Sequence, residues 1–464
     1  MSKRSRTILF FICLFLFFLI TPFIILYSQG YRIDWDSKKI IKTGGFYFKV
    51  WPEGAQVFID GKFQKKTGFL SGSAYINNLV PKEYKVEIEK EGFQTWQKNL
   101  EIKEDLVTKS ESIILIPANP KYINLAQNTD SVFFSPDGKR IILKETDAKG
   151  WSFKIFELDK NLKSNLFSGF QSTEIELIDL KFSSDSNTIL FTTKEKEGIK
   201  YWILGLESPI QEKMPTDLIS LDFLGDKASD ISFNPNDTQK IFFINGISLF
   251  GANIVTKKID LNPIVNNIIS YEISEGNLFW LSNDGFLFKA DLSGGNAEKL
   301  NHDSFAVKKD KEYQIYVKSP LLFLREDEVL YILKPESQVF EKIAEPIMDI
   351  KFSPDGKEML YFNNYEIGIL FLEKKEGQPQ KKALENLFLT RFSEKIDQVL
   401  WLNSNYLVFN AGSKIKISEI DDRDKLNIYD FGEFNSPKMS FNQFDKKLYI
   451  LTEENLSSSE KLLP

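Results

Sequence analysis

The chain of 464 residues is long enough for two or three domains, and its 42% hydrophobic and 27% charged residues are ordinary for a globular protein. Its 25 glycines and 17 prolines exclude a collagen-like or largely disordered chain. The net charge is −6, and beyond the three basic residues at the N-terminus 56 basic residues face 65 acidic ones, about −9, which disfavours nucleic acid and anionic lipid as partners.

The first predicted element is a membrane-spanning helix. Residues 8–27 are 20 consecutive residues without a charge, which matches the roughly 20 that a helix needs to cross a bilayer. Lys3, Arg4 and Arg6 lie only on the N-terminal side, so residues 1–7 are predicted to be a cytoplasmic tail. The bulk of the chain is then expected outside the cell, held by a single-pass signal anchor.

A cleaved signal peptide is the alternative for this segment. Signal peptides have an apolar core of 7–15 residues followed by a small-x-small site. Here the core is longer, and Ser28-Gln29-Gly30-Tyr31 follows it. Cys13, the single cysteine, lies inside the apolar run, so no disulfide can form within the chain, and the bulky Ile12 before it disfavours lipidation.

Residues 28–44 are predicted to form a polar linker and residues 45–117 a small domain of strands. Phe46, Phe48 and Val50 alternate with other residues at the period of a half-buried strand. Asp60-Gly61 is a strong hairpin signal, and alternation returns at residues 84–88. Because no helical pattern appears, we expect an antiparallel β-sandwich.

This segment resembles PEGA domains. It contains the literal signature Pro52-Glu53-Gly54-Ala55, and the other elements follow in the family's order: Asp60-Gly61-Lys62, Leu79-Val80-Pro81, Tyr84-Lys85-Val86 and Lys90-Glu91-Gly92-Phe93. The family usually has Thr-Pro where this chain has Thr67-Gly68, which affects one loop. The resemblance implies a module of the bacterial cell envelope with no chemistry attached.

Residues 118–464 repeat a unit of an apolar residue, any residue and Phe, followed by a polar turn and an apolar strand. Five clear copies and three weaker ones recur roughly every 44 residues, which is the period of β-propeller blades. The copies begin at Val132, Leu180, Ile231, Tyr271, Tyr313, Ile350, Val399 and Met439. We therefore predict an all-β propeller in which eight blades are favoured and seven stay possible, since the weak copies could merge.

The turn of the repeat is Ser-Pro-Asp-Gly at residues 135–138 and 353–356. Proline fixes φ, aspartate caps the turn and glycine adopts φ > 0. The unit resembles the blades of TolB-like, or WD-repeat-like, bacterial propellers. That resemblance implies the architecture and says almost nothing about the ligand.

No catalytic, cofactor-binding or metal-binding residue is predicted. His302 is the one histidine, in a polar stretch expected to be a surface loop, so zinc clusters and Cys–His dyads are excluded. Asp421-Asp422-Arg423-Asp424 resembles a calcium loop only in composition. Trp51, Trp96, Trp202, Trp280 and Trp401 are expected to serve core packing.

We therefore expect a non-enzymatic binding or scaffold protein of the bacterial cell envelope, with the propeller docking an envelope protein or a cell-wall glycan. One alternative is a glycan hydrolase or lyase, which would need two carboxylates about 5–10 Å apart at the propeller axis and would fail if Asn, Ser and apolar residues lined the funnel. Another is a sensor, whose signal a partner would have to carry, because the predicted cytoplasmic tail is so short.

Overall fold

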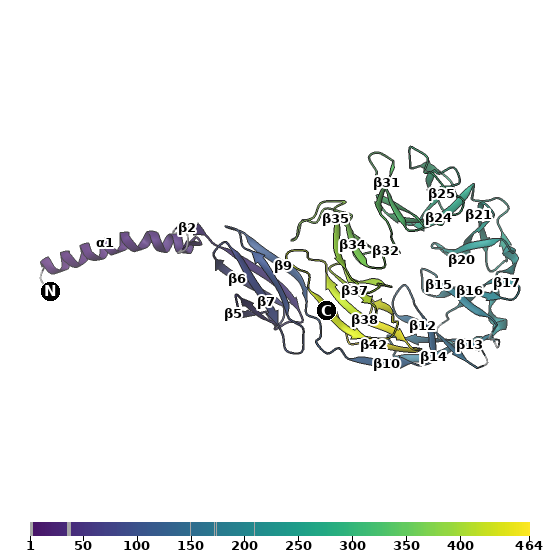
Figure 1. The fold of residues 1–464 in the computed structure, drawn as a ribbon, viewed down its shortest axis with the longest axis horizontal. Helices are drawn as coiled ribbons and strands as arrows, with labels where there is room; N and C mark the ends of the chain where they lie inside the picture. The colour runs from purple at the N-terminus through teal and green to yellow at the C-terminus, as the bar shows by residue number, and fades with distance from the viewer. Residues whose placement is uncertain (1–2, 35–38, 149, 171, 173, 208) are drawn as a thin grey trace.

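The computed structural model describes residues 3–34, 39–148, 150–170, 172, 174–207 and 209–464. Helix α1 (Lys3–Ser28) stands apart from the β-rich part of the molecule (Figure 1). Its segment Arg4–Ser28 is long and apolar enough to cross a membrane, with a mean hydropathy of 3.0 and none of its most apolar window buried. The predicted span therefore forms a helix, and residues 1–2 of the predicted tail lie outside the described residues.

The segment predicted as a linker contains a β-hairpin. Strands β1 (Tyr31–Asp34) and β2 (Lys39–Lys42) pair antiparallel, with Ile33 opposite Ile40. β-Branched residues facing each other across two strands stabilise such a pair, a signal that the polar composition of residues 28–44 obscured. Residues 35–38 of the predicted linker lie outside the described residues.

The next segment is a two-layered sandwich. One sheet has the order β6 (Ser73–Leu79), β3 (Gly44–Trp51), β9 (Val107–Ile114), and the other has the order β5 (Lys62–Lys66), β4 (Gln56–Ile59), β7 (Glu83–Glu89), β8 (Trp96–Glu101). The alternating residues Phe46, Phe48 and Val50 face Val86 and Ile88 in one apolar core. The turn between β4 and β5 is the predicted one, with positive φ at both Asp60 and Gly61.

The prediction of a purely antiparallel sandwich is wrong for one pair of strands. Strand β9 runs parallel to β3, with Gly45 opposite Val107. The chain reaches β9 from β8, which belongs to the other sheet, so β9 is not joined to β3 by a hairpin that would reverse its direction.

After the sandwich, the described residues form eight sheets of four or more strands, which we call blades 1 to 8. Blade 1 comprises β11 (Thr129–Phe134), β12 (Arg140–Asp147), β13 (Gly150–Glu157) and β14 (Leu162–Phe170). Blade 2 comprises β15 (Glu176–Phe182), β16 (Thr188–Glu195), β17 (Gly198–Gly205) and β18 (Ile219–Ser220). Blade 3 comprises β19 (Ala228–Asn234), β20 (Asp237–Asn245), β21 (Ser248–Asn253) and β22 (Lys258–Ile259), and β23 (Val265–Asn266) also pairs with β21. Blade 4 comprises β24 (Ile268–Ser274), β25 (Asn277–Ser282), β26 (Leu287–Asp291) and β27 (Glu298–Lys299). Two 3₁₀ turns, Pro215–Asp217 and Asp222–Leu224, flank β18.

The remaining blades follow the same order along the chain. Blade 5 comprises β28 (Tyr313–Lys318), β29 (Leu321–Glu326), β30 (Val329–Leu333) and β31 (Phe340–Ala344). Blade 6 comprises β32 (Asp349–Phe352), β33 (Glu358–Phe362), β34 (Glu366–Phe371) and β35 (Asn386–Arg391). Blade 7 comprises β36 (Val399–Asn403), β37 (Tyr406–Ala411), β38 (Lys414–Glu419), β39 (Ile428–Glu433), and blade 8 comprises β40 (Lys438–Asn442), β41 (Lys447–Thr452), β42 (Asn455–Ser459) and β10 (Tyr122–Ala126). Each of the eight predicted repeat units supplies the first strand of one blade.

The blades close into a ring. Strand β10, the first of this part of the chain, completes blade 8 by pairing with β42, so both ends of the propeller share one sheet. An apolar cluster joins every blade to the next around the ring, for example Leu143 with Tyr449 between blades 1 and 8, and Val408 with Ile450 between blades 7 and 8. In Figure 1, β15, β16 and β17 lie in that order from the middle of the ring outward. The propeller therefore has eight blades, the number that the sequence favoured.

The repeat turns have the predicted chemistry. Gly138 and Gly356 have φ of +70° and +73°. The Ser135 hydroxyl donates to Asp137 at 2.6 Å, and Asp137 also accepts the Lys139 N–H at 3.0 Å. These side-chain bonds replace ladder bonds that the tight turn cannot make.

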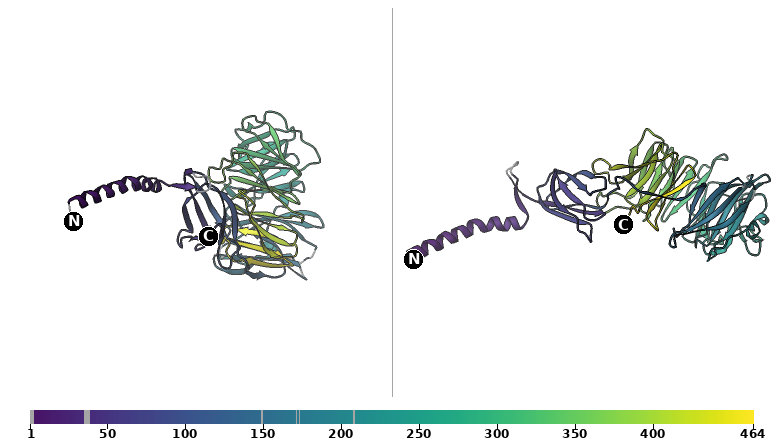
Figure 2. Two further views of the ribbon diagram at one scale, coloured as in Figure 1. Left: turned by 60° about the vertical axis from the view of Figure 1, so that its left-hand side comes forward. Right: turned by 90° about the horizontal axis from the view of Figure 1, so that it is seen from below.

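The sandwich is docked on blade 7, between α1 and the ring (Figures 1 and 2). Ile114 and Ile116 join an apolar cluster with residues of blades 7 and 8, and the Ile114 N–H donates to the Tyr406 hydroxyl at 3.0 Å. The C-terminal Leu462 and Leu463 are buried in the same cluster. This apolar contact is the base of the interface between the two domains.

A buried ion pair fastens the same interface. The Lys98 ammonium of β8 lies 2.8 Å from Glu419 of β38, with 0% and 4% of the two side chains exposed. Lys98 also donates to three backbone carbonyls between residues 421 and 425, at 2.7–2.9 Å. Glu419 further accepts the Trp96 indole N–H at 2.8 Å and the Asn427 amide at 2.7 Å. Both charges are fully hydrogen-bonded, the condition under which an ion pair survives burial.

Candidate functional site

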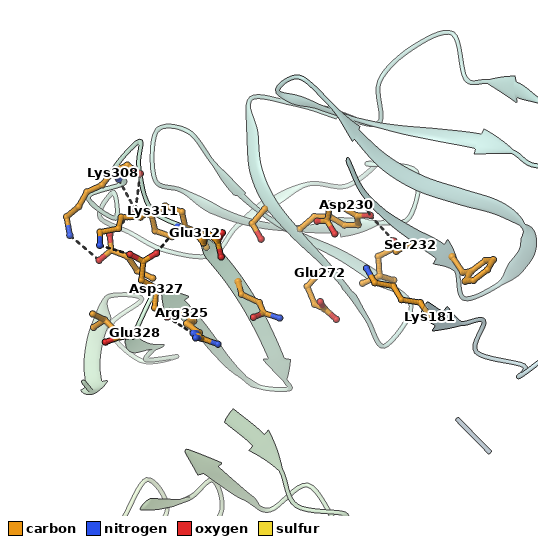
Figure 3. Close-up of a pocket in the computed structure, with 18 of the residues that line it drawn as sticks. Lys181, Asp230, Ser232, Glu272, Lys308, Lys311, Glu312, Arg325, Asp327 and Glu328 are labelled. Atoms are coloured by element: carbon orange, nitrogen blue, oxygen red, sulfur yellow. Dashed lines mark hydrogen bonds and ion pairs between the residues drawn. The ribbon is translucent and has the colours of Figure 1, made fainter. Parts of the chain in front are cut away.

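A pocket of about 1270 Å³ opens on the inner side of the ring, against blades 2 to 5 (Figure 3). Its wall is built from β15, β19, β24 and β28, the first and innermost strands of these blades, and continues to the turn between β29 and β30. The charged side chains that line it form two groups on opposite sides in Figure 3. One group contains Lys181, Asp230 and Glu272, and the other contains Lys308, Lys311, Glu312 and residues 325–328.

Strand periodicity explains why polar groups face this pocket. Leu180, Ile231 and Tyr271 are buried between blades, so their neighbours in the strands, Lys181 and Glu272 among them, point to the opposite face. The pocket is thus lined by the middle residue of the repeat's apolar-x-Phe triplet, which no interblade packing constrains.

Asp230 is placed by a bulge in β19. The register with β20 shifts between Ser229 and Ser232, and Asp230 has φ of +46°. The Tyr271 hydroxyl donates to the Asp230 carbonyl at 2.6 Å and lies 2.8 Å from the Ser232 hydroxyl. A bulge re-aims the residues beside it, and the tyrosine fixes that conformation by binding its backbone.

The pKa values of Asp230 and Glu272 are both raised. Burial in the pocket wall, together with the nearby Asp230 charge, raises the pKa of Glu272 to about 7. Burial likewise raises the pKa of Asp230, although solvent reaches its side chain through the pocket. Lys181 opposes both shifts. Neither carboxylate forms a hydrogen bond or an ion pair with another described residue, so near neutral pH a proton is retained on this pair for part of the time.

The opposite wall contains two ion pairs. Lys308 pairs with Glu326 at 3.1 Å, and Lys311 pairs with Asp327 at 2.5 Å. The Tyr313 hydroxyl donates to Glu326 at 2.8 Å, and burial, followed by that carboxylate, raises the pKa of Tyr313 to about 12. Both lysines of this wall are thus used in ion pairs, whereas the Glu312 side chain has no partner among the described residues.

His302 and the acidic stretch at residues 421–424, which the sequence offered no reason to call a site, lie outside this pocket. His302 lies in a loop after β27 and is mostly exposed, as expected. The stretch that resembled a calcium loop is part of the docking interface: Asp421 pairs with Arg423 at 2.6 Å, Asp422 pairs with Lys381 at 2.7 Å, and Asp424 accepts the Asn99 N–H at 2.7 Å. Among the described residues, no group of three or more His, Cys, Asp or Glu side chains could hold a metal.

The tryptophans serve packing, and Trp96 also forms a hydrogen bond across the interface between the two domains. Trp280 and Trp401 are buried in interblade clusters, and Trp51 packs against the cluster below the sandwich. Trp96 is fully buried and also donates to Glu419 across the interface. Cys13 lies on the exposed surface of α1.

Two groups of residues at the interface and the pocket were not predicted from the sequence, although the sequence contains an indication of each. Lys98 stands between Trp96 and Leu100 in the buried phase of β8, where a charge indicates a buried partner. Lys181 and Glu272 are the middle residues of repeat triplets, a position that faces the ring axis in a propeller. Neither the Glu419 partner of Lys98 nor the proximity of Asp230 to Glu272 could be inferred, since these residues lie on another domain or blade.

Comparison with known proteins adds little to these findings. No family model and no curated protein matches the chain. Among solved structures, the chain is similar to the computationally designed Ika8 protein (TM-score 0.44, 13% identity, 73% of this chain and 97% of that one) and to Hsv2p of Kluyveromyces lactis (0.41, 13%, 67% and 99%). It is also similar to an oligogalacturonate lyase from Vibrio parahaemolyticus (0.41, 11%, 74% and 97%). Likenesses this distant carry no information about function, and the resemblance to PEGA and TolB-like families stays a prediction.

Proposed function

We propose that the chain is a membrane-anchored binding protein of the bacterial cell envelope, without catalytic activity, whose propeller docks another protein at its central pocket. Helix α1 supports the anchor by its length and composition. The basic residues before the span support a location of the propeller outside the cell. The sandwich acts as a PEGA-type adaptor that holds the ring at a set position above the anchor.

One observation carries the docking proposal: a large open pocket in a closed ring contains two carboxylates, Asp230 and Glu272, that have no hydrogen-bond or ion-pair partner among the described residues. A volume of about 1270 Å³ exceeds what a small ligand fills and suits several residues of a peptide segment. Seven carboxylates and four cations stand among the described lining residues, and two of the cations are used in ion pairs. A basic side chain of the partner is the group that Asp230 and Glu272 would bind best.

Photo-crosslinking in intact cells tests this proposal. Glu312 lines the pocket, is exposed, and has a side chain without a partner among the described residues, so a photoreactive amino acid placed at position 312 should yield a discrete protein adduct. The same amino acid at position 159, in the exposed turn of blade 1, is the matched control. The paired changes Asp230→Asn and Glu272→Gln should reduce the adduct at position 312. Equal labelling at both positions, or no adduct at either, would refute docking at the pocket.

A second candidate is the glycan hydrolase or lyase, favoured by one specific observation. The funnel is lined by charged side chains, and Asp230 and Glu272 are two carboxylates with raised pKa in one pocket. Such a pair supplies a proton donor and a base near neutral pH. The purified full-length protein would then release reducing ends from cell-wall glycan, and Glu272→Gln would abolish the release. An equal release by the variant, or none by the native chain, rejects this candidate.

A further inference from the structure

The hairpin β1–β2 has an apolar pair that no described part of the protein covers. Ile33 and Ile40 lie opposite each other in the register and are 44% and 58% exposed. Lys39, next to Ile40, is exposed as well. Isolated two-stranded hairpins are marginal in water, so this one needs a surface to lie against.

The position of the hairpin is set from both sides by Arg32. Its guanidinium stacks on the Tyr27 ring at 3.5 Å and donates to the Tyr27 carbonyl at 2.9 Å, which ties the hairpin to the end of α1. The same guanidinium donates to Asn78 at 3.0 Å, at the end of β6 in the sandwich. Lys42 pairs with Asp105 at 2.9 Å on the sandwich as well. The hairpin is therefore held between helix and sandwich.

The chain length then determines what the hairpin meets. The apolar run ends at Tyr27 and β1 begins at Tyr31, so these four residues reach at most about 14 Å. In the right-hand view of Figure 2 the chain after the helix turns aside from the helix axis before it enters the sandwich. If α1 spans a bilayer, the hairpin begins at the headgroup layer, where tyrosine rings and lysines are favoured.

We propose that the β1–β2 hairpin is a membrane-surface element that rests Ile33 and Ile40 in the phospholipid headgroup layer. This inference depends on the membrane anchor of the proposed function. Burial of the two isoleucines supplies the attraction, and Lys39 reaches the lipid phosphates. The protein outside the membrane is acidic apart from the hairpin, so anionic lipid would repel it, and we expect the hairpin to bind neutral lipid. The contact would set the tilt of the sandwich, and with it the direction in which the propeller pocket faces.

Depth-dependent quenching tests the proposal on the full-length protein in phosphatidylcholine nanodiscs that hold one copy each, which excludes a second copy as the cover. In a Cys13→Ser background, an environment-sensitive dye is attached to Leu16→Cys, Ile40→Cys or Phe63→Cys. Phe63 is 54% exposed on β5 of the sandwich and serves as the control. Lipid spin-labelled near the headgroup should quench the dye at position 40 about threefold more than the dye at position 63.

A second change separates the hairpin from the dye's own affinity for lipid. Ile33→Ser in the Ile40→Cys background should reduce the quenching at position 40, whereas Tyr75→Ser, on an exposed sandwich residue, should not. Equal quenching at positions 40 and 63, with strong quenching of position 16 by deep spin labels, overturns the hairpin inference and leaves the anchor standing. Absence of quenching at position 16 overturns the anchor itself.

Discussion

Replacing Lys98 by Met tests whether the buried ion pair holds the sandwich on the propeller. The change removes the 2.8 Å pair with Glu419 and three hydrogen bonds to backbone carbonyls, while Met keeps most of the buried stem. Hydrogen bonds to a charged group contribute about 1.5–3 kcal/mol each, with hydration of the unfolded chain already included, and bonds that share one ammonium group do not add. Removal of one partner from a buried pair typically costs about 3–5 kcal/mol, because the other charge stays buried, and we expect that loss here.

The assay is urea unfolding of the full-length protein in detergent, followed by tryptophan fluorescence, since Trp96 lies in the interface. Lys85→Met is the matched control: Lys85 lies on the neighbouring strand and pairs with Glu87 at 2.7 Å, but its side chain is 47% exposed, so we expect a loss below about 1 kcal/mol. Adding Glu419→Gln to Lys98→Met should recover part of the stability, because it removes the uncompensated charge. Equal losses for Lys98→Met and Lys85→Met would refute the reasoning.

Three further predictions concern the propeller. Burial and the neighbouring Asp355 raise the pKa of Glu358 from 4.5 to about 7. Glu358 therefore ionises at lower pH in the unfolded chain than in the folded protein, and stability falls as pH rises from about 4.5 to 7. Glu358→Gln should raise the melting temperature more at pH 8 than at pH 5, and an equal effect at both pH values would contradict this. Asp137→Ala removes the cap of the first repeat turn and should cost about 1–2 kcal/mol in urea unfolding, against a negligible change for the exposed Asp159→Ala; equal losses would argue against the cap. Ser458→Pro interrupts β42, which pairs with β10 and β41, and should cost about 3 kcal/mol or more; an unchanged thermal midpoint would mean that the ring does not depend on this closure.

The repeat architecture was readable in the sequence because its signals are local. The apolar-x-Phe triplet, the Ser-Pro-Asp-Gly turn and the strand after it lie within about 15 residues of each other, and hairpin formation needs nothing from outside that window. The three weaker units lack the full turn but keep the strand alternation, and each forms a blade. The apolar helix was equally evident, since a run of 20 uncharged, mostly apolar residues is typical of a membrane-spanning helix.

The candidate site could not be derived in the same way. Asp230 and Glu272 are 42 residues apart and line one pocket only because successive blades turn their first strands toward one axis. A carboxylate in a strand is ordinary on an exposed face. The pKa of these two is raised because the ring buries them in a pocket wall and, for Glu272, also brings Asp230 near it. The 65 acidic residues of the chain gave no reason to select these two.

The sequence by itself determined the anchor-like helix, the small β domain and the repeating blades, because each depends on periodicity and turn chemistry between near neighbours. Only the tertiary structure decided the parallel pairing of β9, the number of blades, the interface of Lys98 with Glu419 and the pocket on the axis. These features join residues separated by tens to hundreds of positions, and such contacts are selected by how whole sheets bury their apolar faces against each other.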